Sequence, residues 1–309
     1  MTHQVRMACK NDVDALLELA ALTAGGLTNF PHDRGVLAER VAWSEQSCGV
    51  IIDSPQDEFY LFVLEDTETG RIVGTSSIYS KIGVRWPFYS YKLSRISHVS
   101  NGTGRHFSTH ILTLVNDFDG ASEVGGLFLA PQARSAGLGQ LLSRSRYLFI
   151  SQHRERFGST IVAEMRGWLD GAISPFWEAV GRKFFDSEFH AADLYNATQG
   201  NQFIADLMPK FPIYTALLPL DAQSAIGRPH VDAVPAKAML EAEGFVYDGY
   251  VDIFDAGPTL HARIDQLRTI TECRLVGDGL ELPLPGRNQR LRARNSGLEF
   301  TVSLEALES

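Results

Sequence analysis

The segment from Arg134 to Gly139 has the residue types of an anion-binding turn. An apolar stretch, 124–129, precedes it and predicts a short β-strand, and residues 138–150 have the spacing of an amphipathic helix. Gly137 and Gly139 have no Cβ, so a bulky anion can approach the main chain closely. The first amides of a helix are unpaired and carry partial positive charge there. This turn could therefore bind a diphosphate.

Two common phosphate-binding motifs do not describe this turn. No Gly-Lys-Ser/Thr follows its glycines, as a Walker loop requires, and the third glycine of the dinucleotide fingerprint is missing. An ordinary strand–turn–helix with two incidental glycines is the plainer alternative. Charge favours the anion site, because residues 132–156 hold five arginines and one acid in a chain of net charge −9. A solvated arginine face would explain the same charges.

The composition is that of a globular protein without a nucleic-acid-binding surface. The 309 residues are 44% hydrophobic and 21% charged, and the acidic pI of about 5.5 argues against nucleic acid as a partner. No apolar leader and no run approaching 18 apolar residues occurs, so we expect a cytoplasmic protein with no membrane segment. The three cysteines are scattered, and His98, His106 and His110 lack the spacing of a zinc site, so neither disulfides nor a metal is expected.

The order of expected elements is that of a mixed α/β layer structure. Splayed strands before the glycine turn would expose backbone groups that can pair with an extended ligand. Strands are expected at 5–9, 58–65, 71–79, 89–99, 111–115, 124–129, 160–165 and 246–254, and helices at 13–20, 34–46, 138–150, 174–185, 202–208 and 234–243, before a strand-like tail after 276.

Several segments together resemble the arginine N-succinyltransferase family of the GCN5-related N-acyltransferase (GNAT) superfamily. The matching residues extend from about 5 to 276. The segments that carry the resemblance are Gly25-Gly26-Leu27-Thr28, 62–66, 68–70, 122–123, 127–129, the turn 134–139, Val162-Ala163-Glu164-Met165-Arg166-Gly167, Ser174-Pro175-Phe176-Trp177, 207–210, 212–215, Glu243-Gly244-Phe245, 250–255 and 257–260.

The resemblance implies a fold and a reaction. The fold would be a GNAT-like α/β (α+β) acyltransferase domain over 1–276 with a mixed central sheet, a family-specific second half at about 190–276, and a small β-rich appendage at 277–309. The reaction would be transfer of succinyl from succinyl-CoA to the α-amino group of L-arginine, without a metal or a permanently bound cofactor. The family's acid/base histidine would be His230, and its succinyl-CoA contact would be Leu127.

An acyl-CoA donor of this kind implies further roles for residues of the strand at 124–129 and of the glycine turn. The main-chain amides of Leu127 and Leu129 would pair with the pantetheine arm and polarise the thioester oxygen. Arg134 and the amides near Gly137 and Gly139 would hold the diphosphate. Arg166 is a candidate for the succinyl carboxylate, and the loop with Gly25 and Gly26 can line the acceptor pocket. Candidates for the acceptor guanidinium are Glu164, Asp117 and Asp119, each of which could instead form an internal ion pair.

Two alternatives remain at this point. Ornithine or another basic amino acid could replace or accompany arginine as the acceptor. The chain could also be a catalytically silent acyl-CoA-binding module with a regulatory role. Either a homo-oligomer or a hetero-oligomer is compatible with the resemblance.

Overall fold

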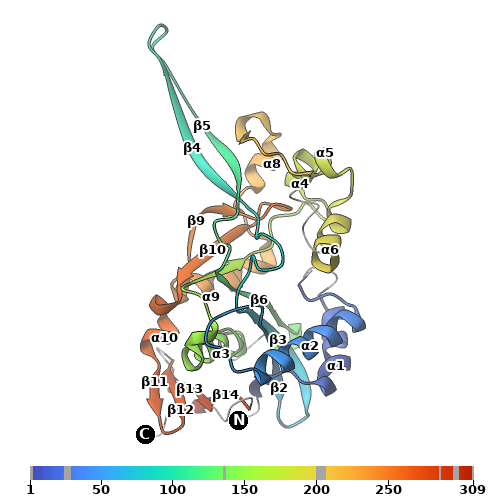
Figure 1. Ribbon diagram of the computed structural model, residues 1–309, viewed down its shortest axis with the longest axis vertical. Coiled ribbons are helices and arrows are strands. Elements are labelled where there is room, and N and C mark those ends of the chain that lie inside the picture. Colours follow the sequence, from blue (N-terminus) through green and yellow to red (C-terminus); the bar gives the residue numbers. More distant parts are fainter. Residues whose placement is uncertain are drawn as a thin grey trace.

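A computed structural model describes residues 3–23, 29–134, 137–199, 207–284, 287–294 and 299–307. In these ranges the strands form one mixed sheet in the order β11-β12-β13-β14-β1-β2-β3-β6-β7-β10-β9-β4-β5-β8. Helices lie on both of its faces (Figure 1). This arrangement confirms the expected α/β fold class with a mixed central sheet. No helix in the described ranges is long and apolar enough to span a membrane.

The first part of the chain follows the expected order closely. The two central strands form the expected hairpin, with Asp66 paired to Arg71. A buried cluster from the first two helices, including Leu16, Leu37 and Val41, covers one face of the sheet at Phe59. The elements are β1 (His3–Met7), α1 (Val13–Ala21), α2 (Arg34–Gly49), β2 (Phe59–Asp66) and β3 (Arg71–Tyr79).

A long hairpin comes next and projects from the body of the molecule (Figure 1). It consists of β4 (Ser90–Ser100) and β5 (Arg105–Val115), joined by a turn at 101–104. The expectation that the second strand begins at Ile111 is wrong. The ladder continues to the pair Ser100–Arg105, because cross-strand pairing supports residues whose own sequence is too polar to predict a strand.

The centre of the sheet holds β6 (Ser122–Leu129) and β7 (Thr160–Glu164), and the helix between them is α3 (Leu138–Gln152). Apolar side chains of α3, such as Leu141, Leu142 and Leu148, pack on the sheet face opposite α1 and α2. Among the described strands β6 and β7 pair in parallel, whereas the other ladders are antiparallel.

The second half combines short helices with the remaining strands of the sheet. Its helices and strands pack around a second core that contains Phe176, Trp177 and Phe254. The elements are α4 (Pro175–Ala179), α5 (Gly181–Phe185), α6 (Phe189–Gln199), β8 (Ile213–Tyr214), α8 (Leu220–Ala225), α9 (Val234–Glu243), β9 (Val246–Val251), β10 (Pro258–Arg263) and α10 (Arg268–Glu272).

Two expected elements in this half end early. The helix expected at 174–185 begins after a Ser174 cap and breaks at Val180, and a Cβ at Gly181 would lie 2.1 Å from the ring of Trp177. The strand expected to reach 254 ends at Val251, because Asp252 Oδ1 accepts bonds from the amides of residues 254 and 255 and closes a turn. The helix expected at 202–208 lies mostly outside the described residues.

The tail continues the same sheet. Its last strand pairs with β1, and its leucines, including Leu282 and Leu291, join the core under α3. The strands are β11 (Arg274–Val276), β12 (Gly279–Pro283), β13 (Gln289–Arg294) and β14 (Thr301–Ala306). A domain boundary near 276 remains a prediction. Short 3-10 helices complete the chain at η1 (Lys10–Asp12), η2 (Pro131–Ala133), η3 (Arg154–Arg156), η4 (Thr215–Leu217), η5 (Val231–Ala233) and η6 (Ile264–Gln266).

Candidate active site

The parallel strands β6 and β7 separate after a short paired stretch. They pair at Ser122–Ile161 and Glu123–Val162, and their later residues do not pair with each other. A bulge in β6 contributes to the divergence, because the ladder with β3 places one extra β6 residue near Gly126, whose φ is +58°. The two strands therefore form a fork that opens toward their carboxyl ends, as the sequence predicts.

The backbone of β6 faces the open side of this fork. The amide of Ala130 donates to the carbonyl of Val73 in β3 at 2.8 Å. Because backbone groups alternate sides along a strand, the amides of Leu129 and Leu127 point away from β3, toward the gap. Their side chains are half-buried against the core under α3. An extended ligand in the gap could therefore pair with β6 as an added strand.

The glycine turn lies between the end of β6 and the start of α3. Gly137 is the residue before the first turn of α3 and has φ +85°, a conformation that other residues rarely adopt. A Cβ at Gly139 would be 3.8 Å from the sulfur of Met239 in α9, so this glycine leaves an open approach rather than avoiding a clash. The exposed Arg134 donates from Nε to the carbonyl of Leu129 at 3.0 Å and so links the turn to the end of β6.

A residue of the tail that sequence reasoning missed also reaches the turn. A Cβ at Gly137 would lie 2.3 Å from Nη1 of Arg287 and 3.2 Å from its Cζ. The guanidinium of Arg287 therefore lies directly over the glycine. No local signal could have identified Arg287, because its place depends on how the tail strands pack against α3.

His230 lies beside the carboxyl end of β7. Its amide donates to the carbonyl of Arg166 at 2.8 Å, and Pro229 forms a bridge with Gly167. The amide of Met165 donates to the carbonyl of Pro258 in β10 at 3.1 Å. Because backbone groups alternate sides along an extended chain, the carbonyl of Arg166 points the other way, into the gap between β7 and β6. The segment with His230 thus lines the fork, and the structure brings His230 and Arg166 together.

The imidazole of His230 has a defined orientation. Its Nδ1 accepts a hydrogen bond from the amide of Asp232 at 3.2 Å and lies 3.6 Å from the carboxylate of the same residue. The side chain is 26% exposed. An accepting Nδ1 assigns the proton of the neutral ring to Nε2, so that Nε2 is the donor.

Two further predictions concern Arg166, for the succinyl carboxylate, and the loop with Gly25 and Gly26, for the acceptor. Arg166 is half-buried at the end of β7, and its Nε is shielded from solvent. Its role as the cation for the succinyl carboxylate remains a prediction. Gly25 and Gly26 lie outside the described residues.

Five carboxylates interact near the carboxyl end of β7, and they belong to Glu123, Glu164, Asp193, Asp252 and Asp255. Two of them hold the backbone, since Asp255 accepts from the amides of Gly167 and Gly257 at 2.7 and 2.8 Å and Asp252 closes the turn after β9. Burial raises the pKa of both groups, and Asp252 adds to the effect on Asp255. Burial, Asp252, and then Glu123 raise the pKa of Glu164 well above its usual range. This is a site where a cation would be favourable.

Glu123 is the group in this cluster that is suited to proton transfer. Burial raises its pKa to about 7, while the charge of Arg40 lowers it. A Cβ at Gly125 would lie 3.1 Å from Nδ2 of Asn29 and 3.7 Å from Oε1 of Glu123, so Gly125 leaves room in front of the carboxylate. The sequence did not single out Glu123, because burial rather than residue type produces its pKa.

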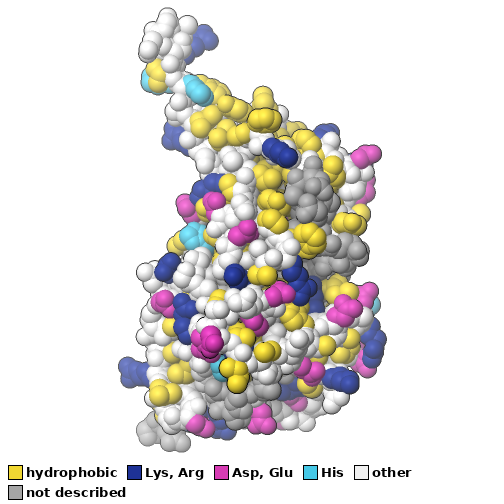
Figure 2. Space-filling model, viewed as in Figure 1, with side chains coloured by type: hydrophobic (Ala, Val, Ile, Leu, Met, Phe, Trp, Pro, Cys, Tyr) yellow, Lys and Arg dark blue, Asp and Glu magenta, His cyan; other side chains and the backbone are white. Residues whose placement is uncertain are grey.

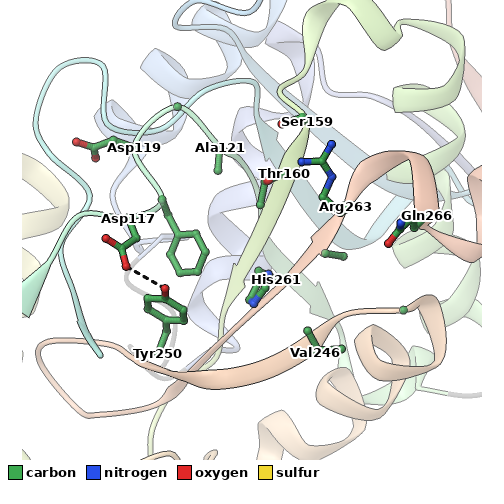
Figure 3. A pocket seen from close by; sticks show the side chains of 14 residues that line it. Asp117, Asp119, Ala121, Ser159, Thr160, Val246, Tyr250, His261, Arg263 and Gln266 are labelled. Carbon is green, nitrogen blue, oxygen red and sulfur yellow. Dashed lines mark hydrogen bonds between the residues drawn. The ribbon is translucent and has the colours of Figure 1, made fainter. Parts of the chain in front are cut away.

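Asp117 and Asp119 belong to a different place. They line a cavity of about 500 Å³ at the amino end of β7, together with Thr160 and His261 (Figure 3). Asp117 accepts a hydrogen bond from the Tyr250 hydroxyl at 2.9 Å. Of the three acids considered for the acceptor guanidinium, Glu164 is thus the one at the fork.

Comparisons with known proteins identify the family of the chain. Residues 3–269 match the family model described as "Arginine N-succinyltransferase beta subunit". The chain belongs to the arginine N-succinyltransferase family. An arginine N-succinyltransferase of Enterobacter sp. (strain 638) is 43% identical over 91% of this chain and 82% of its own length. The arginine N-succinyltransferase subunit beta of Pseudomonas aeruginosa is 46% identical over 87% of this chain and 78% of its own length.

A solved member of the family has the same fold. The arginine/ornithine succinyltransferase subunit AI of Pseudomonas aeruginosa matches with a TM-score of 0.87 and 33% identity, over 100% of this chain and 90% of that one. The arginine N-succinyltransferase match at 3–269 contains the fork, the glycine turn and His230. Strands β11–β14, and with them Arg287, lie beyond it.

Proposed function

We propose that the chain is an arginine N-succinyltransferase that transfers succinyl from succinyl-CoA to the α-amino group of L-arginine. The observation that carries the proposal is the fork between β6 and β7, which has the glycine turn at its mouth and the interacting acids Glu123 and Glu164 on its two strands. Relatives named for this reaction, at 42–46% identity, support the choice of substrates. Succinyl-CoA is a cosubstrate that leaves as CoA, and the proposed location is the cytoplasm.

The donor lies along β6. Its pantetheine arm pairs with the main chain at Leu127 and Leu129, and an amide that points into the gap polarises the thioester oxygen. The diphosphate meets the amides at Gly137 and Gly139, with Arg134 on one side and Arg287 on the other. Two arginines at a helix start suit an anion of this charge.

Glu123 takes the proton that the α-ammonium group of arginine must lose before it can attack. A base with a pKa of about 7 is ionised in a large fraction of molecules at neutral pH and is still basic enough to accept a proton. The free amine then forms the C–N bond at the thioester carbonyl, and the C–S bond breaks. The second amine proton passes to water as the amide forms; Glu123 then releases its proton and His230 takes one up, which leaves one net proton per turnover.

His230 supplies the proton for the departing thiolate. The ring donates from Nε2 in its doubly protonated form, in which Nδ1–H faces the Asp232 carboxylate, 3.6 Å from Nδ1, and no longer accepts from the Asp232 amide. The reaction yields N2-succinyl-L-arginine, CoA and one net proton. Arg166 pairs with the far carboxylate of the succinyl group, which acetyl-CoA lacks.

The guanidinium of the acceptor binds Glu164, where Asp252 and Asp255 add negative potential. A bound cation lowers the pKa of Glu164 and keeps it ionised. Ornithine is a second candidate acceptor, supported by the name of the solved Pseudomonas aeruginosa structure.

A CoA-release assay tests the proposal. Initial rates are measured with succinyl-CoA and acetyl-CoA, each against arginine, ornithine and lysine. We expect the highest kcat/KM for succinyl-CoA with arginine, and mass spectrometry should find the product acylated at the α-nitrogen. If arginine is not among the good acceptors, the proposed acceptor is wrong. Binding of CoA without turnover would instead favour a silent acyl-CoA-binding module.

A further inference from the structure

The turn between β9 and β10 lies directly on the segment that leaves β7. We call residues 252–257 the β9–β10 turn and residues 165–168 the β7 exit. Asp255 joins the two, since its Oδ2 accepts a hydrogen bond from the amide of Gly167 at 2.7 Å and its Oδ1 accepts one from the amide of Gly257 at 2.8 Å. A Cβ at Gly257 would lie 2.6 Å from the nitrogen of Gly167. The main chains of the turn and the exit are therefore in contact, and one carboxylate holds them together.

The same turn holds the segment that carries His230. We call residues 227–230 the histidine segment. The amide of Gly227 donates to the carbonyl of Ala256 at 2.8 Å. Gly227 has φ +71°, and a Cβ there would lie 2.5 Å from the hydroxyl of Tyr247, so this point of attachment is closely packed. The β9–β10 turn is thus bound to the β7 exit through a side chain and to the histidine segment through a carbonyl.

The two segments that the turn holds also pair with each other. The amide of His230 donates to the carbonyl of Arg166 at 2.8 Å, and the amide of Trp168 donates to the carbonyl of Arg228 at 3.0 Å. The guanidinium of Arg228 also lies over the ring of Trp168, 4.6 Å from its centroid. A shift of the β7 exit would therefore carry the main chain of His230 with it.

Burial and backbone conformation set the β9–β10 turn apart. On the face drawn in Figure 2, acidic side chains lie dispersed over the surface among lysines and arginines, whereas Asp255 is only 6% exposed. A buried carboxylate is costly unless its oxygens are hydrogen-bonded. The next residue, Ala256, is fully buried and has φ +56°, a conformation that costs free energy for a residue with a Cβ. A buried acid beside a strained residue indicates that the geometry of this turn serves the site next to it.

We propose that Asp255 is a positioning residue for His230. It holds the β7 exit against the β9–β10 turn, and the histidine segment, which pairs with that exit, then places the imidazole of His230 at the fork. Asp255 acts through main-chain bonds, so its loss should lower turnover. The negative potential that it shares with Asp252 near Glu164 should instead affect binding of the acceptor. The inference deepens the reaction proposed above and rests on it.

Asp255→Asn tests the proposal, with Asp252→Asn as the matched control. Each change removes one carboxylate of the same interacting pair. Asparagine has a single acceptor oxygen. Both amides that Asp252 binds meet its Oδ1, so both bonds can remain, whereas the two amides at Asp255 meet different oxygens, so one bond is lost.

Steady-state kinetics with succinyl-CoA and arginine compares the two variants. We expect kcat of Asp255→Asn to fall roughly 10- to 100-fold, as misplacement of a reacting group does, and kcat of Asp252→Asn to stay within about twofold of wild type. Both variants should raise the KM for arginine. Equal losses of kcat in the two variants overturn the proposal.

Combination with His230→Ala separates positioning from a general loss of structure. If Asp255 acts through His230, the double variant should have the kcat of His230→Ala alone. A further fall of about tenfold or more in the double variant would show that Asp255 acts elsewhere. If Asp255→Asn alone does not fold, the series is made in Ala256→Gly, which removes the strained φ and should raise the midpoint of thermal unfolding.

Nuclear magnetic resonance of chains with ¹⁵N-labelled histidine provides a readout that does not require turnover. The imidazole signal of His230, assigned by its loss in His230→Ala, should move in Asp255→Asn and stay in place in Asp252→Asn. A His230 signal that is the same in wild type and Asp255→Asn overturns the proposal. A signal that moves in a protein unable to succinylate arginine supports the positioning and refutes the proposed reaction instead.

Discussion

The guanidinium of Arg287 lies against Gly137, so closely that a Cβ at position 137 would be 2.3 Å from Nη1. Gly137 belongs to the strand–turn–helix unit at the centre of the family match, whereas Arg287 belongs to the tail beyond it. Through this contact a residue of the tail lies at the turn that we assign to the donor diphosphate. It also gives the glycine a second constraint in addition to its φ of +85°.

Loss of Arg287 should weaken donor binding more than chemistry. We expect Arg287→Ala to raise the KM for succinyl-CoA by roughly five- to thirtyfold, because a charge-assisted bond to phosphate contributes about 1–2 kcal/mol, with little change in kcat. Steady-state kinetics measures both. Arg274→Ala, which removes another exposed arginine of the tail, is the control and should leave KM unchanged. Equal effects of the two variants would contradict a specific role for Arg287.

Gly137→Ala should act partly through Arg287. We expect a loss of about 1–3 kcal/mol in the free energy of unfolding from backbone strain and a higher KM for succinyl-CoA. In the double variant with Arg287→Ala the steric part of the effect disappears, so the two changes should be less than additive. Chemical denaturation of the four proteins in this cycle measures the coupling. Strict additivity would show that the contact does not matter.

Glu123 should control the acid limb of the pH–rate profile. Since a base acts in its ionised form, kcat/KM should rise as the pH increases through about 7. Glu123→Gln should lower kcat by roughly 10²–10⁴-fold and remove this limb. Glu68→Gln, on an exposed turn, is the control. A Glu123→Gln variant that retains the wild-type profile would exclude Glu123 as the base.

The same carboxylate should make stability depend on pH. The pKa of Glu123 is higher in the folded chain than the ordinary value of 4.5, so folding favours its protonated form. The stability that protonation contributes is fully present below about 4.5 and is lost as the pH rises through about 7. Relative to wild type, Glu123→Gln should therefore gain roughly 1–3 kcal/mol between pH 5 and pH 8. Urea unfolding at both pH values tests this, and equal slopes with pH would contradict it.

His230 should affect turnover without affecting donor binding. We expect His230→Ala to lower kcat by roughly 10²–10⁴-fold, whereas the Kd for CoA stays within about twofold. CoA release measures the first quantity and calorimetry the second. His106→Ala, which changes an exposed histidine of β5, is the matched control. A His230 variant with wild-type turnover would remove His230 from the mechanism and leave the assignment to the family intact.

Local signals in the sequence determined much of the fold and the donor half of the site. Alternating and helical apolar spacing predicts β2, β3, β6 and α3, because each depends on neighbours a few residues away. The Ser174 cap, the left-handed Gly244 and the glycines at 137 and 139 are likewise local features. Family resemblance supplied His230, which no local pattern would have distinguished from a solvated loop histidine.

Tertiary structure alone decided the features that depend on distant residues. The pKa of Glu123 comes from burial at the fork, and Arg287 reaches Gly137 because the tail strands pack on α3. The segment at His230 meets Arg166 through a backbone bond. Burial, ladder pairing and side-chain contact arise between segments far apart in the chain, so residue types and spacing determine which groups are available but not which ones meet.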